Sequence, residues 1–346
     1  MLPAGNNNSG FNLKKAEIAI DKFLKMQSYG SSLMERLCLE AGPRPPGSSG
    51  IKMARKMLAE EYKNAGIGLI HTEAVTFATK DQITSELYVS KTDRSAGIHC
   101  ESLACINSAS GNVTAKLFYG NNLSIDDLYS LGKQATAAVL LVNATEVTGG
   151  KLQPMQKKVA LAQAAGAAAI IFIGQHPTLP ALYFINKSHI PVLSVSAGDG
   201  KKLIKRCQNR DVSVSMQVKG RSRTVKCSNW IAEMGPASAA SDIIVACAHL
   251  DHFSISPGAV DDLSGVVTLT MAARAIAPFS SFFRRRMRLI LFTGEEFGYV
   301  GSKQYVREHA EELNRIKLVL SLDCMFKSTA EGLAVMWAPK MKNYLA

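Results

Sequence analysis

The chain has 346 residues, of which 47% are hydrophobic and 20% are charged. This composition is typical of a folded globular protein and excludes disordered, collagen-like and long coiled-coil chains. Forty Lys and Arg residues against 28 Asp and Glu residues give a formal net charge of +12, which favours acidic partners in general without identifying one.

At about 100–200 residues per domain, the length predicts two domains. The longest apolar stretch, residues 159–173, is interrupted by Gln163 and Gly166 and is shorter than the roughly 18 residues that a membrane-spanning helix needs. We therefore expect no membrane span. The run MLPAGNNNSGFNLKK lacks a basic segment followed by an apolar one, so we expect no secretory signal in it.

Seven cysteines without a C-x-x-C pair argue against a zinc ribbon or a dense disulfide framework. They leave one disulfide bridge open.

The first part of the chain predicts helices followed by strands. Residues 12–38 place apolar side chains at helical intervals, and the GPRPPG run that follows stops any helix. A second helix is expected at 50–65, with Ser48 or Ser49 as its cap and a stop at Gly66. Strand-like segments come next, at 70–78 and 83–90.

Residues 112–220 predict a separate small domain. Short β-rich runs at 139–142, 168–173 and 191–195 alternate with one Ala-rich helix around 152–165. The segment carries no cluster of ionisable residues with catalytic spacing. We interpret it as a non-catalytic interaction or lid module.

From residue 229 onward, strands alternate with helices. Strands are expected at 243–248, 287–292 and 318–322, and helices at 262–277 and 296–312. This alternation predicts an α/β fold with a mainly parallel sheet that helices cover on both faces. Sheets of this kind bind ligands at the carboxyl ends of their strands.

The three strands of this region each end in side chains that can bind metal ions. His249 and Asp251 follow the first strand, Glu295 and Glu296 the second, and Asp323 the third, while Asp261 and Asp262 open the intervening helix. One imidazole with several carboxylates suits zinc, or manganese or cobalt in its place. Two such ions need a bridging carboxylate, which one of the adjacent aspartates can supply, and a carboxylate outside the ligand set would serve as general base.

Each of these pieces also has a structural explanation. A His-x-Asp pair at a strand end is often a local hydrogen bond, and adjacent aspartates or glutamates at a helix start suit capping and the helix dipole. Their joint occurrence at three successive strand ends favours a metal site.

A family resemblance follows from three runs, VACAHLDHFSISPGAVDDLSGVVTLTMAARAIA, RRRMRLILFTGEEFGYVGSKQYV and KLVLSLDC. Together they resemble the co-catalytic di-zinc metallopeptidases, the family of aminopeptidases and glutamate carboxypeptidase-like enzymes. AGPRPPGSSG is similar to the N-terminal part of the same proteins, and residues 112–220 resemble the protease-associated domain that many members carry as an insertion. The resemblance covers most of the chain. It implies a zinc exopeptidase fold, with a metallopeptidase domain at 1–111 and 221–346 and a β-rich protease-associated domain at 112–220.

The resemblance also implies a ligand set for two zinc ions. His249 and Asp323 would bind the first zinc, Asp261 would bridge both ions, and Glu296 would bind the second.

The resemblance also implies which residues act as acid–base groups. Glu295 would be the general base, taking a proton from the attacking water and returning it to the leaving amine. Asp251 would orient His249 from behind and raise its basicity, and Asp262 is interpreted as structural.

The implied reaction is hydrolysis of a terminal bond of a peptide substrate, with aminopeptidase expected before dipeptidase or carboxypeptidase. The family is mostly secreted, periplasmic or lysosomal, and a homodimer is left open. Basic clusters at 201–206, 219–226 and 284–286 lack interleaved aromatic residues, so we expect solvated surfaces and no nucleic-acid partner.

One departure from the family concerns the second zinc. Members supply a last histidine from a loop well beyond the position of Asp323, and this sequence has no histidine after His309. Either the chain is truncated at its C-terminus, which we favour, or His252 or His309 substitutes. We therefore expect one tightly bound metal and weak or no peptidase activity, with an inactive peptidase-like binding scaffold as the rival interpretation.

The cysteines nearest to these residues are not expected to bind metal. Cys247 and Cys324 flank the proposed ligands, but alternation along a strand predicts that their side chains point away from the metal edge. We interpret both as small buried hydrophobic residues.

Overall fold

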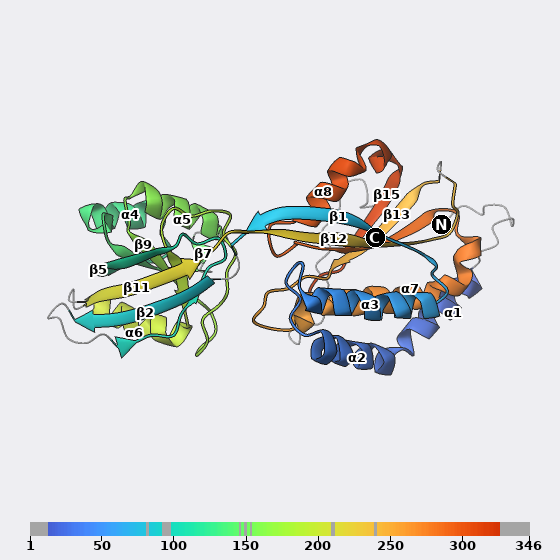
Figure 1. The fold of residues 1–346 in the computed structure, drawn as a ribbon, viewed down its shortest axis with the longest axis horizontal. Helices are drawn as coiled ribbons and strands as arrows, with labels where there is room; N and C mark the ends of the chain where they lie inside the picture. The colour runs from blue at the N-terminus through green and yellow to red at the C-terminus, as the bar shows by residue number, and fades with distance from the viewer. Residues whose placement is uncertain are drawn as a thin grey trace. The chain divides into compact units, whose positions relative to one another are not determined.

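The computed structural model describes residues 13–80, 83–91, 98–144, 147–148, 151–152, 154–208, 212–238 and 241–325. The chain divides into two compact units, Met1–Thr76 with Lys226–Ala346 and Phe77–Val225 (Figure 1). The second unit includes the strand at 83–91, which pairs with a strand near the end of that unit.

The first unit contains a five-stranded sheet. Its strands are β1 (Leu69–Thr79), β12 (Arg223–Met234), β13 (Ile243–His249), β14 (Arg286–Phe292) and β15 (Ile316–Ser321). Its helices are α1 (Leu13–Leu24), α2 (Gln27–Arg36), α3 (Ser49–Asn64), α7 (Ser264–Ile276) and α8 (Val300–Glu308), with short helical segments at Leu37–Ala41, Ala259–Leu263, Ala277–Phe282 and Ala310–Arg315.

The strand order is β1-β12-β14-β13-β15. β13 runs parallel to both β14 and β15, whereas β12 is antiparallel to β14. Because His249 lies opposite Phe292 and Cys247 lies opposite Ser321, the three parallel strands end at the same edge of the sheet. The α/β fold predicted from the sequence is confirmed.

Helices cover both faces of this sheet. Figure 1 shows α3 and α7 on one face and α8 on the other. On the first face α3 buries Ile51, Leu58 and Tyr62, and the Tyr62 ring meets the edge of Trp230 at 4.8 Å between centroids. On the other face the buried Tyr305 of α8 packs in a cluster with residues of β12, β13 and β14. This packing fixes the strand ends that carry the candidate ligands.

The N-terminal helix is shorter than the sequence pattern predicted. Residues 12–38 were expected to form one helix, but within the described residues α1 ends at Leu24 and α2 begins at Gln27. The turn lets both helices pack against α7, since partly buried Phe23 and Tyr29 on its two sides join the same core.

The run Ala259–Phe282 is long and apolar enough to cross a membrane by length and composition, with a mean hydropathy of 1.3. Most of its apolar window, 56%, is buried inside the first unit, and α7 supplies residues such as Val266 and Leu269 to the core. Burial in a core accounts for its hydropathy, so the run is weak evidence for a membrane span.

The second unit contains an eight-stranded sheet of order β3-β2-β11-β5-β6-β9-β10-β4 and a two-stranded sheet, β7-β8. Its strands are β2 (Ile83–Lys91), β3 (Ile98–His99), β4 (Leu103–Ala104), β5 (Gly111–Tyr119), β6 (Val139–Asn143), β7 (Val147–Thr148), β8 (Lys151–Leu152), β9 (Ala169–Ile173), β10 (Val192–Val195) and β11 (Val212–Gly220). Its helices are α4 (Ile125–Leu131), α5 (Met155–Ala164) and α6 (Ala197–Gln208), with a short segment at Gly132–Ala135.

The eight-stranded sheet has a core on each face. Leu203 of α6 packs in one core, and Val159 and Ala162 of α5 pack in the other. β6 and β9 are buried along their whole length, which explains why their sequences read as continuous apolar runs.

Candidate metal centre

A buried carboxylate ties the ends of β13 and β15 to the start of α7. Asp262 has no exposed surface, and its Oδ2 accepts a hydrogen bond from the backbone N–H of His249 at the end of β13. Its Oδ1 accepts from Gly265 in the first turn of α7 and from Cys324 after β15. Burial raises the pKa of Asp262 to about 7, against the opposing effect of His249. The structural role expected for this residue agrees with these contacts.

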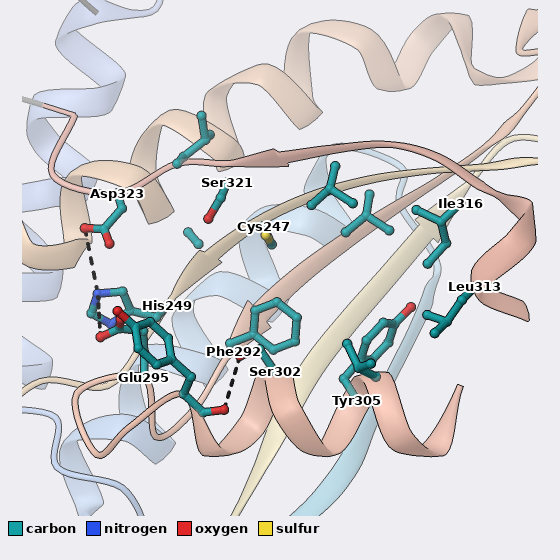
Figure 2. Close-up of a pocket in the computed structure, with 16 residues that line it drawn as sticks. Cys247, His249, Phe292, Glu295, Ser302, Tyr305, Leu313, Ile316, Ser321 and Asp323 are labelled. Carbon is teal, nitrogen blue, oxygen red and sulfur yellow. Dashed lines mark hydrogen bonds and ion pairs between the residues drawn. The ribbon is translucent and has the colours of Figure 1, made fainter. Parts of the chain in front are cut away.

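The imidazole of His249 points into a ring of carboxylates. Its Nε2 lies 2.9 Å from Asp261 Oδ1, 3.7 Å from Glu295 Oε2 and 4.0 Å from Asp323 Oδ1. Figure 2 shows Asp323 and Glu295 approaching the ring from two sides. Burial favours the neutral ring, but the hydrogen bond to Asp261 and the surrounding negative charges outweigh it and raise the pKa of His249 to about 10.

The other nitrogen of His249 fixes the ring. Nδ1 lies 3.0 Å from the backbone oxygen of Asp251, which can only accept, so Nδ1 carries a hydrogen and donates it. In the neutral ring the lone pair is therefore on Nε2, the atom that faces the carboxylates.

For Asp251, the predicted role of orienting His249 stays a prediction. Its Oδ1 is 3.9 Å from His249 Nδ1 and instead accepts the backbone N–H of Glu295 at 3.2 Å. Its Oδ2 is buried and has no hydrogen-bond partner among the described residues. Burial raises the pKa of Asp251 to about 6. The carboxylate thus fastens the loop that carries Glu295, while the backbone of Asp251 orients His249.

Glu295 and Glu296 lie in a loop rather than at a helix start. The predicted helix at 296–312 begins only at Val300, because Gly294, Gly298 and Tyr299 all adopt positive φ and turn the chain back after β14. Burial, reinforced by Glu296, Asp251 and Asp323 against the effect of His249, raises the pKa of Glu295 to about 7. Glu296 is directed to a second imidazole, with its Oε1 2.6 Å from His252 Nδ1.

The two histidines considered as substitutes have different surroundings. His252 lies beside Glu296, within the candidate site. His309 contacts Glu312 and Glu73 through its two ring nitrogens and stacks on Tyr305, so it belongs to a separate ionic network.

Among the described residues, three sets of side chains could hold a metal ion, each with three ligand atoms within 4.8 Å of one another. They are His249 with Asp262 and Asp323, His252 with Asp261 and Glu296, and Asp261 with Asp323 and Cys324. A zinc ion lies about 2.0–2.2 Å from nitrogen and oxygen ligands, so side chains this close can share one ion after small rotations. An imidazole lone pair facing carboxylate oxygens is the donor chemistry that zinc takes.

Of the two cysteines, Cys247 is buried as expected. Cys324 is exposed, and its thiol lies near Asp261 and Asp323, so the prediction that it points away is wrong. Its backbone has positive φ and lies beyond the end of β15, so strand alternation does not extend to it. All seven cysteines lie in the described part of the chain, and no disulfide bond joins any two of them there.

Arg44 holds the segment that joins the candidate ligands. Its side chain is fully buried and donates to the backbone oxygens of Leu250, Gly42, Pro257 and Gly258. Burial lowers the pKa of Arg44 to about 10. The guanidinium therefore connects the end of β13 with the loop leading to Asp261. The GPRPPG run is interpreted from the sequence as a helix stop and as part of the family resemblance, and the sequence predicts no role for Arg44.

A cavity of about 420 Å³ opens beside the centre. His249, Glu295 and Asp323 line one end, and a mostly apolar wall that includes Phe292 and Ile316 lines the rest (Figure 2).

Two family models match this sequence. Residues 229–343 match the model described as Peptidase family M28, and residues 101–203 match the PA domain. These matches confirm the resemblance to metallopeptidases with a protease-associated domain that the sequence motifs indicated.

Named relatives cover different shares of the chain. A probable leucine aminopeptidase 2 of Aspergillus oryzae is 30% identical over 172 residues, which is 48% of this chain and 34% of that protein. Carboxypeptidase Q of Bos taurus is 23% identical over 325 residues, 89% of this chain and 67% of that protein. The chain thus spans about a third of the length of the first relative and about two thirds of the second.

Solved structures share the fold. A zinc aminopeptidase from Bacillus subtilis superposes with a TM-score of 0.67 at 24% identity, covering 86% of this chain and 69% of that one. A Peptidase M28 precursor from Shewanella amazonensis gives a TM-score of 0.73 at 23% identity, covering 90% and 74%.

The pKa shifts at the centre predict how the metal-free protein responds to pH. The pKa values of Asp251, Asp262, Glu295 and His249 are all raised by folding. Each of these groups stabilises the fold below its unfolded pKa, and that contribution is lost as the pH rises through the folded pKa. The melting temperature of metal-free protein should therefore fall between about pH 4 and about pH 10, and added zinc, which displaces these protons, should raise it most at the alkaline end.

Thermal melts with chelator and with zinc check this expectation. Asp251→Asn should make the melting temperature fall less steeply between about pH 4 and about pH 6, because the substitution removes one titrating group. A melting temperature of metal-free protein that rises steadily over this pH range would contradict the expected fall.

Arg44→Met should lower the free energy of unfolding of the first unit by about 3 kcal/mol, because buried carbonyls left without a donor cost about 1–3 kcal/mol each. Urea unfolding measures the change, and the exposed Arg221→Met in the second unit is the control, expected to stay within about 0.5 kcal/mol. Wild-type stability of Arg44→Met would show that these carbonyls do not depend on the guanidinium.

Proposed function

We propose that this chain is a zinc-dependent exopeptidase that removes residues from the amino terminus of peptides. The observation that carries the proposal is the convergence of carboxylate oxygens of Asp261, Glu295 and Asp323 within 4.0 Å of His249 Nε2. The match to Peptidase family M28 over residues 229–343 supports it, as do relatives named leucine aminopeptidase and carboxypeptidase Q.

In this proposal His249, Asp261 and Asp323 hold the first zinc ion, and Asp261 with Glu296 forms part of a second site. When bound, zinc supplies Lewis-acid polarisation of the scissile carbonyl and makes the attacking water more acidic. The carboxylates around the site also attract the ammonium group of a peptide's amino terminus.

Glu295 is the proposed general base. Its pKa of about 7, raised by burial, allows it both to accept a proton from water and to return that proton to the leaving amine near neutral pH. The hydrogen bond from its backbone N–H to Asp251 Oδ1 holds the loop in place, so Asp251 acts as a positioning residue. An intact base argues against the rival interpretation of an inactive scaffold.

The remaining assignments follow from the same family. We propose a metallopeptidase domain at 1–111 and 221–346 and a protease-associated domain at 112–220, with the cavity beside Glu295 receiving a side chain of the substrate. Secretion, or a periplasmic or lysosomal location, and a homodimer also belong to the proposal.

Glu295→Gln tests the chemistry. The amide cannot take a proton, so turnover of an aminoacyl p-nitroanilide should fall by about 10²–10⁴-fold while the zinc content stays unchanged. Glu311→Gln, at an exposed position on the same unit, is the matched control and should keep wild-type turnover. Equal activity of Glu295→Gln and wild type would exclude Glu295 as the base, and zinc loss in that variant would make it a ligand instead.

A further inference from the structure

A histidine between two carboxylates lies directly after α8, away from the candidate metal centre. His309 Nε2 is 2.7 Å from Glu73 Oε1, and Nδ1 is 2.5 Å from Glu312 Oε1. Carboxylate oxygens accept hydrogen bonds and do not donate them, so each ring nitrogen carries a hydrogen. His309 is therefore an imidazolium held between β1 and the segment Ala310–Arg315.

The carboxylate on β1 depends on this ring. Glu73 lies on the strand at one edge of the five-stranded sheet. Its Oε2 is buried and has no hydrogen-bond partner among the described residues, so its charge is balanced from the side of Oε1. There His309 is at hydrogen-bond distance, whereas the half-exposed His71 is 3.7 Å away. The pair of His309 with Glu73 thus fastens the end of α8 to β1.

The other carboxylate connects the ring to the middle of the sheet. Arg288 of β14 is buried and donates to Glu312 Oε1 at 2.5 Å and to Glu233 Oε1 of β12 at 2.6 Å. Burial would raise the pKa of Glu312, but the hydrogen bonds from Arg288 and His309 outweigh it and lower that pKa. Glu312 is thus an ionised acceptor, and through it His309 is linked to two further strands.

The ring also supports a residue of the cavity wall. His309 stacks on Tyr305 of α8, with 4.2 Å between the ring centroids and 25° between the ring planes. The hydroxyl of Tyr305 accepts a hydrogen bond from Arg288 at 2.6 Å. Tyr305 lines the cavity beside the metal centre, and so does Leu313, the residue after Glu312 (Figure 2). The same contacts therefore fix two parts of this wall.

α8 is short and weakly buried. It has nine residues, of which Gly301 and Tyr305 are buried. Helices shorter than about 12 residues are marginal in water on their own, so the position of α8 depends on its contacts with the sheet. A second contact with β1 runs from the side chain of Gln304 to the backbone oxygen of Ala74. Loss of His309 should therefore loosen the end of α8 without detaching the helix.

We infer that His309 is a positioning residue for the substrate cavity. Its imidazolium fastens the end of α8 and the segment after it to β1, which keeps Tyr305 and Leu313 in the cavity wall. Because His309 does not itself line the cavity, it acts on the binding of a substrate side chain and not on the chemical step. This inference rests on the proposed function, in which the cavity receives that side chain.

Amide hydrogen exchange of the whole chain tests the contact without any substrate. His309→Ala should lower the protection of the amides at the end of α8 by about 10-fold, because local opening then breaks fewer interactions. Glu73→Gln keeps the size of the carboxylate side chain and removes its charge, so it should lower the same protection, and it carries the test if His309→Ala does not fold. Arg307→Ala, at an exposed position of the same helix, is the matched control and should keep wild-type protection.

Kinetics with two substrates separates positioning from a loss of folded protein. A leucyl side chain fills more of the cavity than an alanyl one does. His309→Ala should raise the KM for leucyl p-nitroanilide by about 10-fold, with its kcat and both constants for alanyl p-nitroanilide within about 2-fold of wild type. A merely structural role would lower kcat equally for both substrates, because less protein is active, and would leave KM unchanged.

The outcomes distinguish this inference from the proposed function. Wild-type protection of α8 in His309→Ala, or an equal loss of kcat on both substrates with unchanged KM, overturns the inference and leaves the peptidase standing. No hydrolysis of either substrate by wild type overturns the proposed function, and hydrogen exchange then decides alone whether His309 positions α8.

Discussion

The candidate site depends on one buried carboxylate that does not itself need to touch substrate. Asp262 accepts backbone hydrogen bonds from the end of β13, the start of α7 and the residue after β15. Separate segments of chain are thereby held at one point, and the side chains of His249 and Asp323 project beside it. A charge-assisted hydrogen bond in a buried setting is stronger than one on the surface, which makes this connection rigid.

The same constraint explains the electrostatics of the centre. Because Asp251, Asp262 and Glu295 are buried together near His249, burial raises the pKa values of all three carboxyls. Like charges this close are stable only when protons or a cation lie among them. A site that binds protons tightly when empty is suited to exchange them for a divalent ion.

Much of the fold could be predicted from the sequence, because the apolar runs that form β13 and β14 are largely buried in the sheet and the helices have clear periodicity. The convergence of candidate ligands at the strand ends followed from parallel topology. Loop geometry could not be predicted, since it depends on positive φ at Gly298 and Tyr299, which moved the start of α8 to Val300. Contacts between distant loops, such as Arg44 with Leu250 and Asp251 with Glu295, leave no local pattern in the sequence.

The most direct test of the central claim is anomalous X-ray diffraction at the zinc edge from crystals of zinc-loaded protein. The account predicts a peak about 2.0–2.2 Å from His249 Nε2, with oxygens of Asp261 and Asp323 at similar distances. Zinc bound elsewhere on the chain, with His249 Nε2 still hydrogen-bonded to Asp261, would contradict it.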